Sequence, residues 1–220
     1  MNMVDESGVL ARGPWDPGDV DVRWRSEPYR VPPEVTEAAD RALDELRGRG
    51  SPSHDGLAAR LRDFSISSDG RLQLDCEPVR WALRLLPGAG GADSLSALCV
   101  VRDAEGRWLA GRRAAWLATW ARRWALGAAG SVEVDENPAL TLARELSEEW
   151  SVTAERLTVE ALIRLPTQIT MLVGQAWLAA GAEVTPDAEH DAFEWWPADP
   201  GRWPSHADEP LRLTAALLGS

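Results

Sequence analysis

Acidic side chains gather between residues 130 and 152 of this 220-residue chain. Glu145, Glu148 and Glu149 are three and four positions apart, a spacing that places them on one stripe of a helix. Like charges at this spacing destabilise an exposed helix by roughly 0.2–0.5 kcal/mol per pair. A solvated acidic face is one explanation. The other is a divalent cation, because Mg²⁺ takes oxygen ligands and is commonly shared between carboxylates and substrate phosphates.

The helix that would contain these glutamates has clear signals in the sequence. Asn137 can cap its first turn, and Pro138 suits its first helical position. At about 100° per residue, the apolar side chains fall on one arc beside the carboxylates, and we expect this arc to pack on a sheet. The members of the arc are Ala139, Leu142, Ala143, Leu146 and Trp150.

The stretch 130–152 resembles the Nudix box, G-x5-E-x7-R-E-U-x-E-E-x-G-U, in which U is a bulky aliphatic residue. The residues that agree in register are Gly130, Glu136, Arg144, Glu145, Leu146, Glu148, Glu149 and Val152. Ser151 departs from the box, which has a glycine there. Because that glycine normally adopts the left-handed conformation that ends the helix, serine should cost about 1 kcal/mol or change the helix exit.

The resemblance implies a function as well as a fold. It implies an α/β/α sandwich around a mixed sheet, and hydrolysis of a nucleoside diphosphate linked to another moiety, with Mg²⁺ or Mn²⁺ as the cofactor. The metal ligands that it implies are Gly130, through its carbonyl, Glu145, Glu148 and Glu149.

The resemblance also implies roles beside the metal. Arg144 and Glu136 would form an ion pair that orients the catalytic loop. The general base would be a box glutamate such as Glu145, or an acid from a later loop. Glu189 precedes the last expected strand, where such an acid often lies; Asp187 and Asp191 are its rivals. A solvated acidic loop explains each of these last three residues equally well.

The residues before the box leave the substrate open. Four arginines between 112 and 123 could clamp phosphates or could offset the acidic surface. They are Arg112, Arg113, Arg122 and Arg123. The spacing of Trp116, Trp120 and Trp124 predicts a helical ridge in the core rather than a base-stacking wall. We expect His54, His190 and His206 at the surface, and Cys99 in a buried strand.

The pattern along the chain predicts helices over 32–50, 137–150 and 208–218. Residues 54–64 could be a short helix or a turn into a strand. Strands are expected within 70–85 (two strands), 96–103, 106–113, 124–136, 157–165, 169–179 and 192–199. The strands 157–165 and 169–179 could pair antiparallel. This mixture predicts an α/β sandwich around a mixed sheet.

The breaker LPGAGGADS at 86–94 suggests two parts. We expect an N-terminal extension over 1–91, made of an irregular arm up to about residue 30, a helix and strands. The Nudix domain would occupy 92–220. The length of the extension and the serine at 151 keep a second function open, a non-catalytic Nudix-fold module that senses a nucleotide or binds a protein.

Composition limits the partners. The net charge is −12 and the pI is about 4.7, which argues against binding of nucleic acid or anionic membrane through the bulk field. A bound divalent metal would still allow an anionic substrate. The expected partner is a small-molecule nucleotide or nucleotide-sugar diphosphate, and a homodimer is left open. Two cysteines, an acidic start and no long apolar run predict a cytoplasmic protein.

Overall fold

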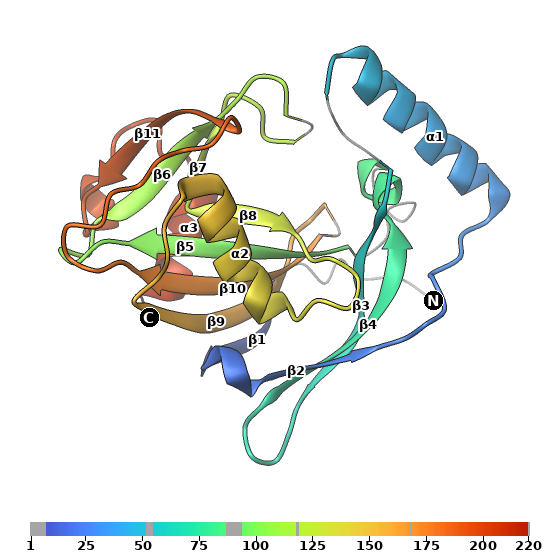
Figure 1. The fold of residues 1–220 in the computed structure, drawn as a ribbon, viewed down its shortest axis with the longest axis horizontal. Helices are drawn as coiled ribbons and strands as arrows, with labels where there is room; N and C mark the ends of the chain where they lie inside the picture. The colour runs from blue at the N-terminus through green and yellow to red at the C-terminus, as the bar shows by residue number, and fades with distance from the viewer. Residues whose placement is uncertain (1–7, 52–54, 87–93, 118, 168, 220) are drawn as a thin grey trace.

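The chain folds around a mixed sheet of eight strands with a three-stranded sheet beside it (Figure 1). This computed structural model describes residues 8–51, 55–86, 94–117, 119–167 and 169–219. The strands are β1 Gly8–Trp15, β2 Val20–Trp24, β3 Leu57–Ile66, β4 Leu72–Arg80, β5 Leu95–Arg102, β6 Trp108–Arg113, β7 Trp124–Leu126, β8 Ala128–Ser131, β9 Arg156–Arg164, β10 Thr170–Trp177 and β11 His190–Trp196. The α-helices are α1 Pro33–Gly48, α2 Pro138–Trp150 and α3 Glu209–Leu218, and the short 3₁₀ helices are η1 Pro17–Asp19, η2 Trp81–Leu85 and η4 Pro200–Arg202.

The large sheet has the order β1-β9-β10-β5-β6-β11, with β7 beside β6 and β8 beside β5. Strands β10 and β5 run parallel in its centre, whereas β9 and β10 are antiparallel. No helix among the described residues is long and apolar enough to cross a membrane. The position of β8 matters for the site, because this strand pairs with β5 and contacts α2, the helix that carries the glutamates.

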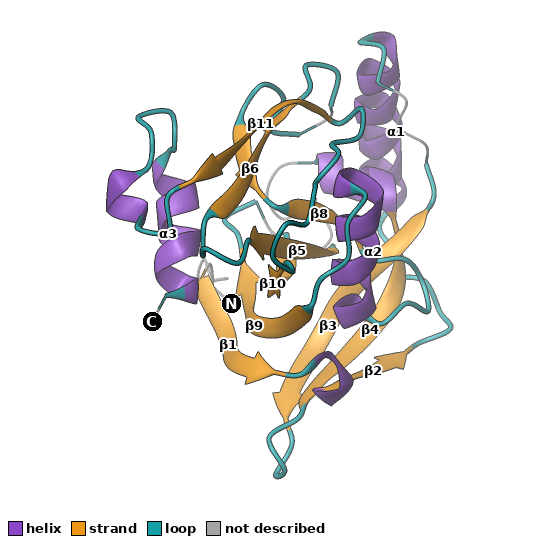
Figure 2. Ribbon diagram, turned by 60° about the vertical axis from the view of Figure 1, so that its left-hand side comes forward, coloured by secondary structure: helices purple, strands orange, loops and turns teal. Residues whose placement is uncertain are grey.

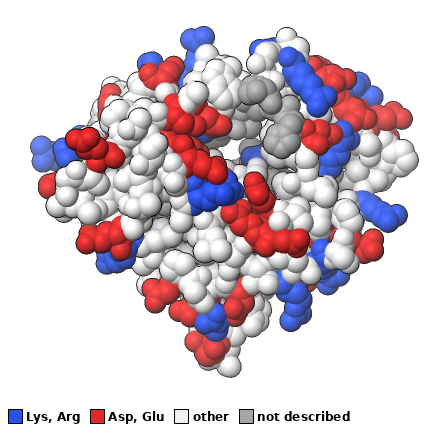
Figure 3. Space-filling model, in the orientation of Figure 1, with Lys and Arg blue, Asp and Glu red and all other residues white. Residues whose placement is uncertain are grey.

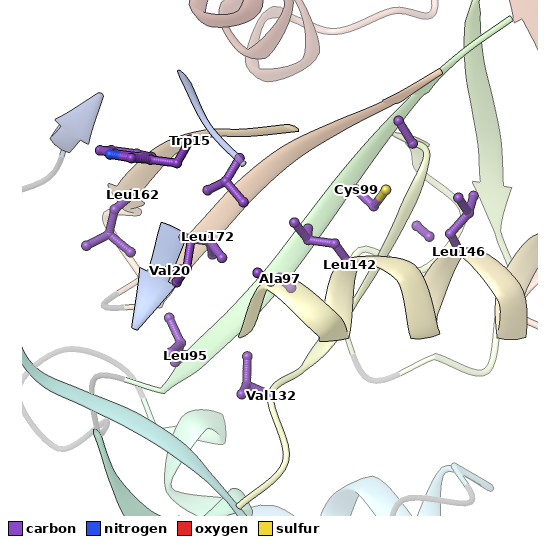
Figure 4. Packing of buried hydrophobic residues seen from close by; sticks show 14 of the residues in the cluster. Trp15, Val20, Leu95, Ala97, Cys99, Val132, Leu142, Leu146, Leu162 and Leu172 are labelled. Atoms are coloured by element: carbon purple, nitrogen blue, oxygen red, sulfur yellow. The ribbon is translucent and has the colours of Figure 1, made fainter. Parts of the chain in front are cut away.

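The alternation of side chains along β5 gives the sheet two buried faces. Ala97 and Cys99 pack with Leu142 and Leu146 of α2 in one core (Figure 4). On the opposite face, Val100 packs in a second core that α3 and several tryptophans complete. Figure 2 shows α2 and α3 on opposite sides of the sheet. The predicted α/β sandwich around a mixed sheet is therefore confirmed.

Most elements expected from the sequence form where their periodicity placed them. The helices within 32–50, 137–150 and 208–218 are present, and β9 and β10 pair antiparallel as predicted. The short stretch 54–64 contributes to strand β3, the second of its two alternatives. Cys99 is fully buried, as expected.

Two expectations for the N-terminal part were wrong. The arm is not irregular, because β1 pairs with β9 at the edge of the large sheet and β2 pairs with β4. Residues 70–85 form one strand, β4, followed by the 3₁₀ helix η2 instead of a second strand. In both places the neighbouring strands decide the outcome, because β-propensity depends on the pairing partner more than on the local sequence.

The N-terminal residues hold the loop that precedes α2. The Asn137 side chain donates to the Val20 carbonyl at 2.8 Å, and the Trp24 indole donates to the Glu136 carbonyl at 3.2 Å. The N–H of Ala59 donates to the Val132 carbonyl at 2.9 Å. The division into 1–91 and 92–220 stays a prediction, and its boundary lies outside the described residues.

Ser151 ends α2 in the left-handed conformation, with φ 54° and ψ 35°. Of the two expectations for this residue, the structure therefore has the strained one: serine adopts the backbone shape that the family's glycine normally supplies. Its N–H still bonds the Ser147 carbonyl at 3.0 Å and closes the last turn.

We therefore expect Ser151→Gly to raise the free energy of unfolding by about 1 kcal/mol, because glycine adopts positive φ without the steric cost of a side chain. Urea unfolding monitored by tryptophan fluorescence measures the change. The control is Ser147→Gly, at an exposed position inside α2, which should lower stability by roughly 0.5 kcal/mol. If both variants lowered stability equally, strain at Ser151 would be disproved.

Candidate functional site

Strand β8 and helix α2 form the base of the site because Gly130 lets them approach closely. A Cβ placed on Gly130 would lie 2.0 Å from the Glu145 carboxylate oxygen Oε1. Any side chain at this position would displace that carboxylate. The glycine that begins the box is therefore required by packing, and the structure brings Gly130 and Glu145 together.

The buried face of α2 includes two of the glutamates. Glu145 and Glu149 are only 8% and 4% exposed, whereas the Glu148 side chain is 59% exposed. Ala143, which we expected in the apolar arc, is exposed instead. The helix is thus rotated relative to the predicted arc, because the loop and β8 cover the side on which the carboxylates lie.

Arg144 supplies the counter-charge for three of the carboxylates. Its Nε and Nη2 donate to Glu136 at 2.9 and 3.1 Å. Its Nη1 donates to Glu145 at 2.7 Å and to Glu148 at 3.1 Å. Its Nη2 also donates to the Ser131 carbonyl at 3.2 Å. All five N–H groups of a guanidinium therefore have acceptors available, and none is left for Glu149.

The pKa values of two carboxylates that bond Arg144 are shifted in opposite directions. Burial acts to raise the pKa of Glu136, but hydrogen bonds from Arg144 and from the Glu133 N–H hold it below its ordinary value. Burial raises the pKa of Glu145 to about 7 although Arg144 opposes the shift. Glu136 is therefore the fixed anion of the pair with Arg144, and Glu145 is the carboxylate whose charge is poorly compensated.

Glu149 is the least compensated group of the site. Burial raises its pKa well above the ordinary value, only partly opposed by the hydrogen bond from the Ala129 N–H, at 3.0 Å from Oε1. Its other oxygen, Oε2, is buried and has no hydrogen-bond partner among the described residues. An acceptor oxygen left without a donor at this depth is costly, so it indicates a missing positive group.

The carboxylate oxygens of the site fit a divalent cation. Carboxylate oxygens are the ligands that Mg²⁺ prefers, and the unpartnered Oε2 of Glu149 has room for another bond. In the described part of the chain, no three Asp, Glu, His or Cys side chains already converge as a preformed metal cluster. Part of the reason is visible, because the Arg144 guanidinium occupies the space between Glu145 and Glu148.

The loop before β11 brings two of the three later acids to the same place. Glu189 and Asp187 line the cavity beside the box glutamates. Burial raises the pKa of Glu189, and the Arg113 guanidinium, 3.6 Å away, opposes the shift. Asp191 forms an ion pair with Arg112 at 2.6 Å and does not line the cavity.

His190 was expected at the surface, and this was wrong. It is 6% exposed and packs on the Trp150 ring with 4.5 Å between ring centroids. Its Nδ1 lies 3.4 Å from Asp187 and its Nε2 lies 3.7 Å from Glu149. Nothing in the sequence separates this histidine from a surface one, because its neighbours in space come from α2. His206 is exposed, as expected, and stacks on Trp124, whereas His54 lies outside the described residues.

A cavity of about 1770 Å³ opens beside the carboxylates, and this face of the molecule is visibly hollowed (Figure 3). Trp116 and Trp120 line it, each 38% exposed, so the predicted helical ridge in the core was wrong. Residues on either side of position 118 form turns, and only Trp124 packs inward, against Trp196. The Trp116 indole is available to a ligand, whereas the Arg123 guanidinium lies over the Trp120 ring, 4.3 Å from its centroid, and leaves its other face for a ligand.

Of the four arginines between 112 and 123, Arg122 is exposed, and the other three have different surroundings. Arg112 pairs with Asp191 and Arg123 pairs with Asp208, which offsets acidic surface charge. Arg113 lines the cavity. The sequence did not single out Arg84, which also lines the cavity and comes from the 3₁₀ helix η2.

The chain belongs to the NUDIX family, whose domain model matches residues 93–212, more than half of the sequence. Solved structures with a similar fold include a MutT protein from Methanosarcina mazei Go1, at 26% identity and a TM-score of 0.40, covering 46% of this chain and 75% of that one. A C. elegans Ap4A hydrolase complex has 19% identity and a TM-score of 0.43, covering 56% and 98%. The NUDIX domain of Shewanella oneidensis NrtR complexed with ADP ribose has 17% identity and a TM-score of 0.42, covering 57% and 86%. No curated protein matches this chain.

The family match confirms the predicted class of enzyme, a Nudix-type diphosphate hydrolase. Enzymes of this family generally need a divalent metal, and the carboxylates described above provide suitable oxygens.

In metal-free buffer, we expect the free energy of unfolding to fall as the pH rises from about 4.5 to 7. Burial raises the folded-state pKa of Glu145 from 4.5 to about 7, so the folded protein keeps a proton that the unfolded chain releases earlier. The stability from this proton is complete below about pH 4.5 and is lost as the pH rises through 7, up to about 3 kcal/mol. Urea unfolding at about pH 5 and about pH 7.5 measures it.

Glu145→Gln is the matched comparison, because the amide cannot titrate in this range. Its free energy of unfolding should depend less steeply on pH than that of the wild type. The same slope in both proteins would show that Glu145 does not titrate as its burial requires.

Proposed function

We propose that this protein hydrolyses the diphosphate linkage of a nucleoside diphosphate derivative, with Mg²⁺ or Mn²⁺ as the cofactor. The substrate would be a nucleoside triphosphate, a dinucleotide or a nucleotide sugar. The observation that supports this best is the buried Glu149 oxygen without a hydrogen-bond partner among the described residues, at the edge of a cavity that Glu145 and Glu148 also line. A cytoplasmic location and the absence of nucleic-acid and membrane partners stay predictions.

The residues of the site would divide the work. Glu145, Glu148 and Glu149, with the Gly130 carbonyl, would hold the cation. When bound, the cation supplies positive charge that screens the diphosphate oxygens and polarises a phosphorus–oxygen bond. Arg144 and Glu136 would keep the loop between β8 and α2 in place. Glu189, whose raised pKa and position in the cavity suit a base, would take the proton of the attacking water.

The volume and the aromatic lining of the cavity support a nucleotide substrate. Its volume of about 1770 Å³ exceeds the roughly 300–1,000 Å³ of most ligand pockets, so a dinucleotide or a nucleotide sugar has room. Trp116 and Trp120 offer ring faces on which a nucleobase can stack, an interaction worth about 1–3 kcal/mol per base in nucleic-acid complexes.

A non-catalytic module that binds nucleotides is the alternative that we carried from the sequence. It predicts thermal stabilisation by a ligand without turnover. The burial of Glu145 and Glu149, whose charges are poorly compensated, favours catalysis over this alternative, because simple binding does not require two carboxylates to be held at this cost.

We expect turnover of at least one member of a panel of nucleoside triphosphates, dinucleotides and nucleotide sugars with Mg²⁺ or Mn²⁺. Glu149→Gln should lower kcat by at least about 100-fold, because the amide keeps the size of the side chain and removes its charge. Release of phosphate or nucleotide, identified by chromatography, measures the rate. The matched control is Glu155→Gln, at an exposed position just after α2, which should keep the wild-type rate. Equal rates in wild type and Glu149→Gln would contradict the proposal.

Glu189→Gln should lower kcat by roughly 10- to 100-fold with little change in KM, since a base acts on the chemical step. Asp191→Asn, two positions further along the chain at the start of β11, should leave both constants unchanged because its carboxylate pairs with Arg112 outside the cavity. Steady-state kinetics on the substrate found in the panel gives both constants. A loss confined to KM in Glu189→Gln would assign Glu189 to binding instead of proton transfer.

A further inference from the structure

Arg84 differs from the other charged residues near the site because its charge has no carboxylate partner among the described residues. Its Nη1 donates to the Ser131 hydroxyl at 2.6 Å. Its Nε is buried without a hydrogen-bond partner in the described part of the chain. A guanidinium has five N–H donors, so several donors of Arg84 remain available for an acceptor.

A second arginine lies close by, which makes the missing counter-charge more costly. Burial lowers the pKa of Arg84, and the charge of Arg113 adds to the shift. Arg113 contacts Glu189 at 3.6 Å, and its side chain is 14% exposed. Two arginines that line one cavity without a shared carboxylate repel each other, and an anion between them would remove the repulsion.

The position of the pair relative to the glutamates is informative. Arg84 and Arg113 both line the cavity that contains Glu145, Glu148 and Glu149. Arg84 is held there by Ser131, whose own carbonyl accepts from Arg144. The face of the molecule in Figure 3 accordingly shows acidic and basic groups around one hollow.

We propose that Arg84 and Arg113 form an anion-binding pair that grips phosphate oxygens of the substrate inside the cavity that the metal-binding carboxylates also line. The planar guanidinium suits this role, because its parallel N–H groups match two phosphate oxygens at once. The inference rests on the proposed diphosphate substrate. It also gives the N-terminal residues a direct part in the site, because Arg84 lies on η2, before the breaker at 86–94.

A structural explanation for Arg84 has a different signature. If Arg84 only tied η2 to the loop after β8 through Ser131, its removal would lower the melting temperature and leave anion affinity unchanged. An anion-binding role lowers anion affinity whether or not the melting temperature moves. Ring packing of Arg84 on Trp81, at 5.6 Å from the ring centroid, is compatible with both explanations.

The test uses inorganic pyrophosphate as the probe, titrated calorimetrically into the full chain in EDTA at low ionic strength. Without a cation, the glutamates cannot hold the probe, so binding reports the arginines. Wild type should show saturable binding. Arg84→Met should bind at least about tenfold more weakly, and Arg84→Lys should lie between the two, because it keeps the charge without the planar fork. Arg47→Met, on the exposed face of α1, removes the same charge away from the cavity and should bind as the wild type does.

Two results would overturn the anion-binding pair. One is wild-type affinity for pyrophosphate in Arg84→Met, whether or not its melting temperature changes. The other is the absence of saturable binding by the wild type in EDTA. If Arg84→Met fails to fold, Arg84→Lys gives the same comparison, and wild-type affinity in that variant together with wild-type KM counts against the proposal.

Failure of the anion-binding pair can be distinguished from failure of the proposed hydrolase activity. Loss of pyrophosphate binding in Arg84→Met, with no turnover of any substrate by the wild type, would remove the hydrolase and support the anion site. Turnover with the same KM and the same pyrophosphate affinity in wild type and Arg84→Met would remove the anion site and support the hydrolase. Where both hold, Arg84→Met should raise KM more than it lowers kcat.

Discussion

The burial of two carboxylates between α2 and β8 is the constraint on which the rest of the site depends. Gly130 removes the side chain that would separate the helix from the strand, so Glu145 is pressed against the β8 backbone. Glu149 reaches the Ala129 N–H one position earlier. Burying charge is expensive unless it is paired and hydrogen-bonded. The contacts around these two side chains either offset that cost or hold the carboxylates in place despite it.

The N-terminal residues help to hold the carboxylates in place by fixing the loop that precedes α2. Val20 and Trp24 bond the residues at the end of that loop, and Ala59 bonds Val132 near its start. Backbone held at both ends of a loop cannot relax away from the buried carboxylates, so the crowding is maintained. The first strands of the chain thus contribute to the geometry of residues more than seventy positions away. An extension that paired only with the edge strand of the large sheet would not hold the loop that precedes α2.

The sequence predicted the parts of the site that lie on one helix and missed the parts that converge from several elements. Spacings of three and four put Glu145, Glu148 and Glu149 on one stripe whatever surrounds them, and Asn137 and Pro138 mark the helix start. The same pattern could not show that Ala143 is exposed, since burial depends on β8. His190 and Arg84 reach the site through β11 and η2, and no local periodicity reports such contacts. The tryptophans at 116 and 120 misled because a spacing of four also fits a loop.

The distribution of positive charge in the site follows from how many donors one arginine has. Arg144 donates its N–H groups to Glu136, Glu145, Glu148 and the Ser131 carbonyl. These bonds fix the loop and offset the charge of the more exposed carboxylates. Glu149 lies beyond its reach, and Glu145 shares a single contact with it, so the deepest carboxylates keep raised pKa values. One arginine cannot both hold the loop and neutralise the interior. The positive charge that the interior still lacks is what makes this part of the fold suited to a divalent cation, and the oxygen that would meet it is Oε2 of Glu149.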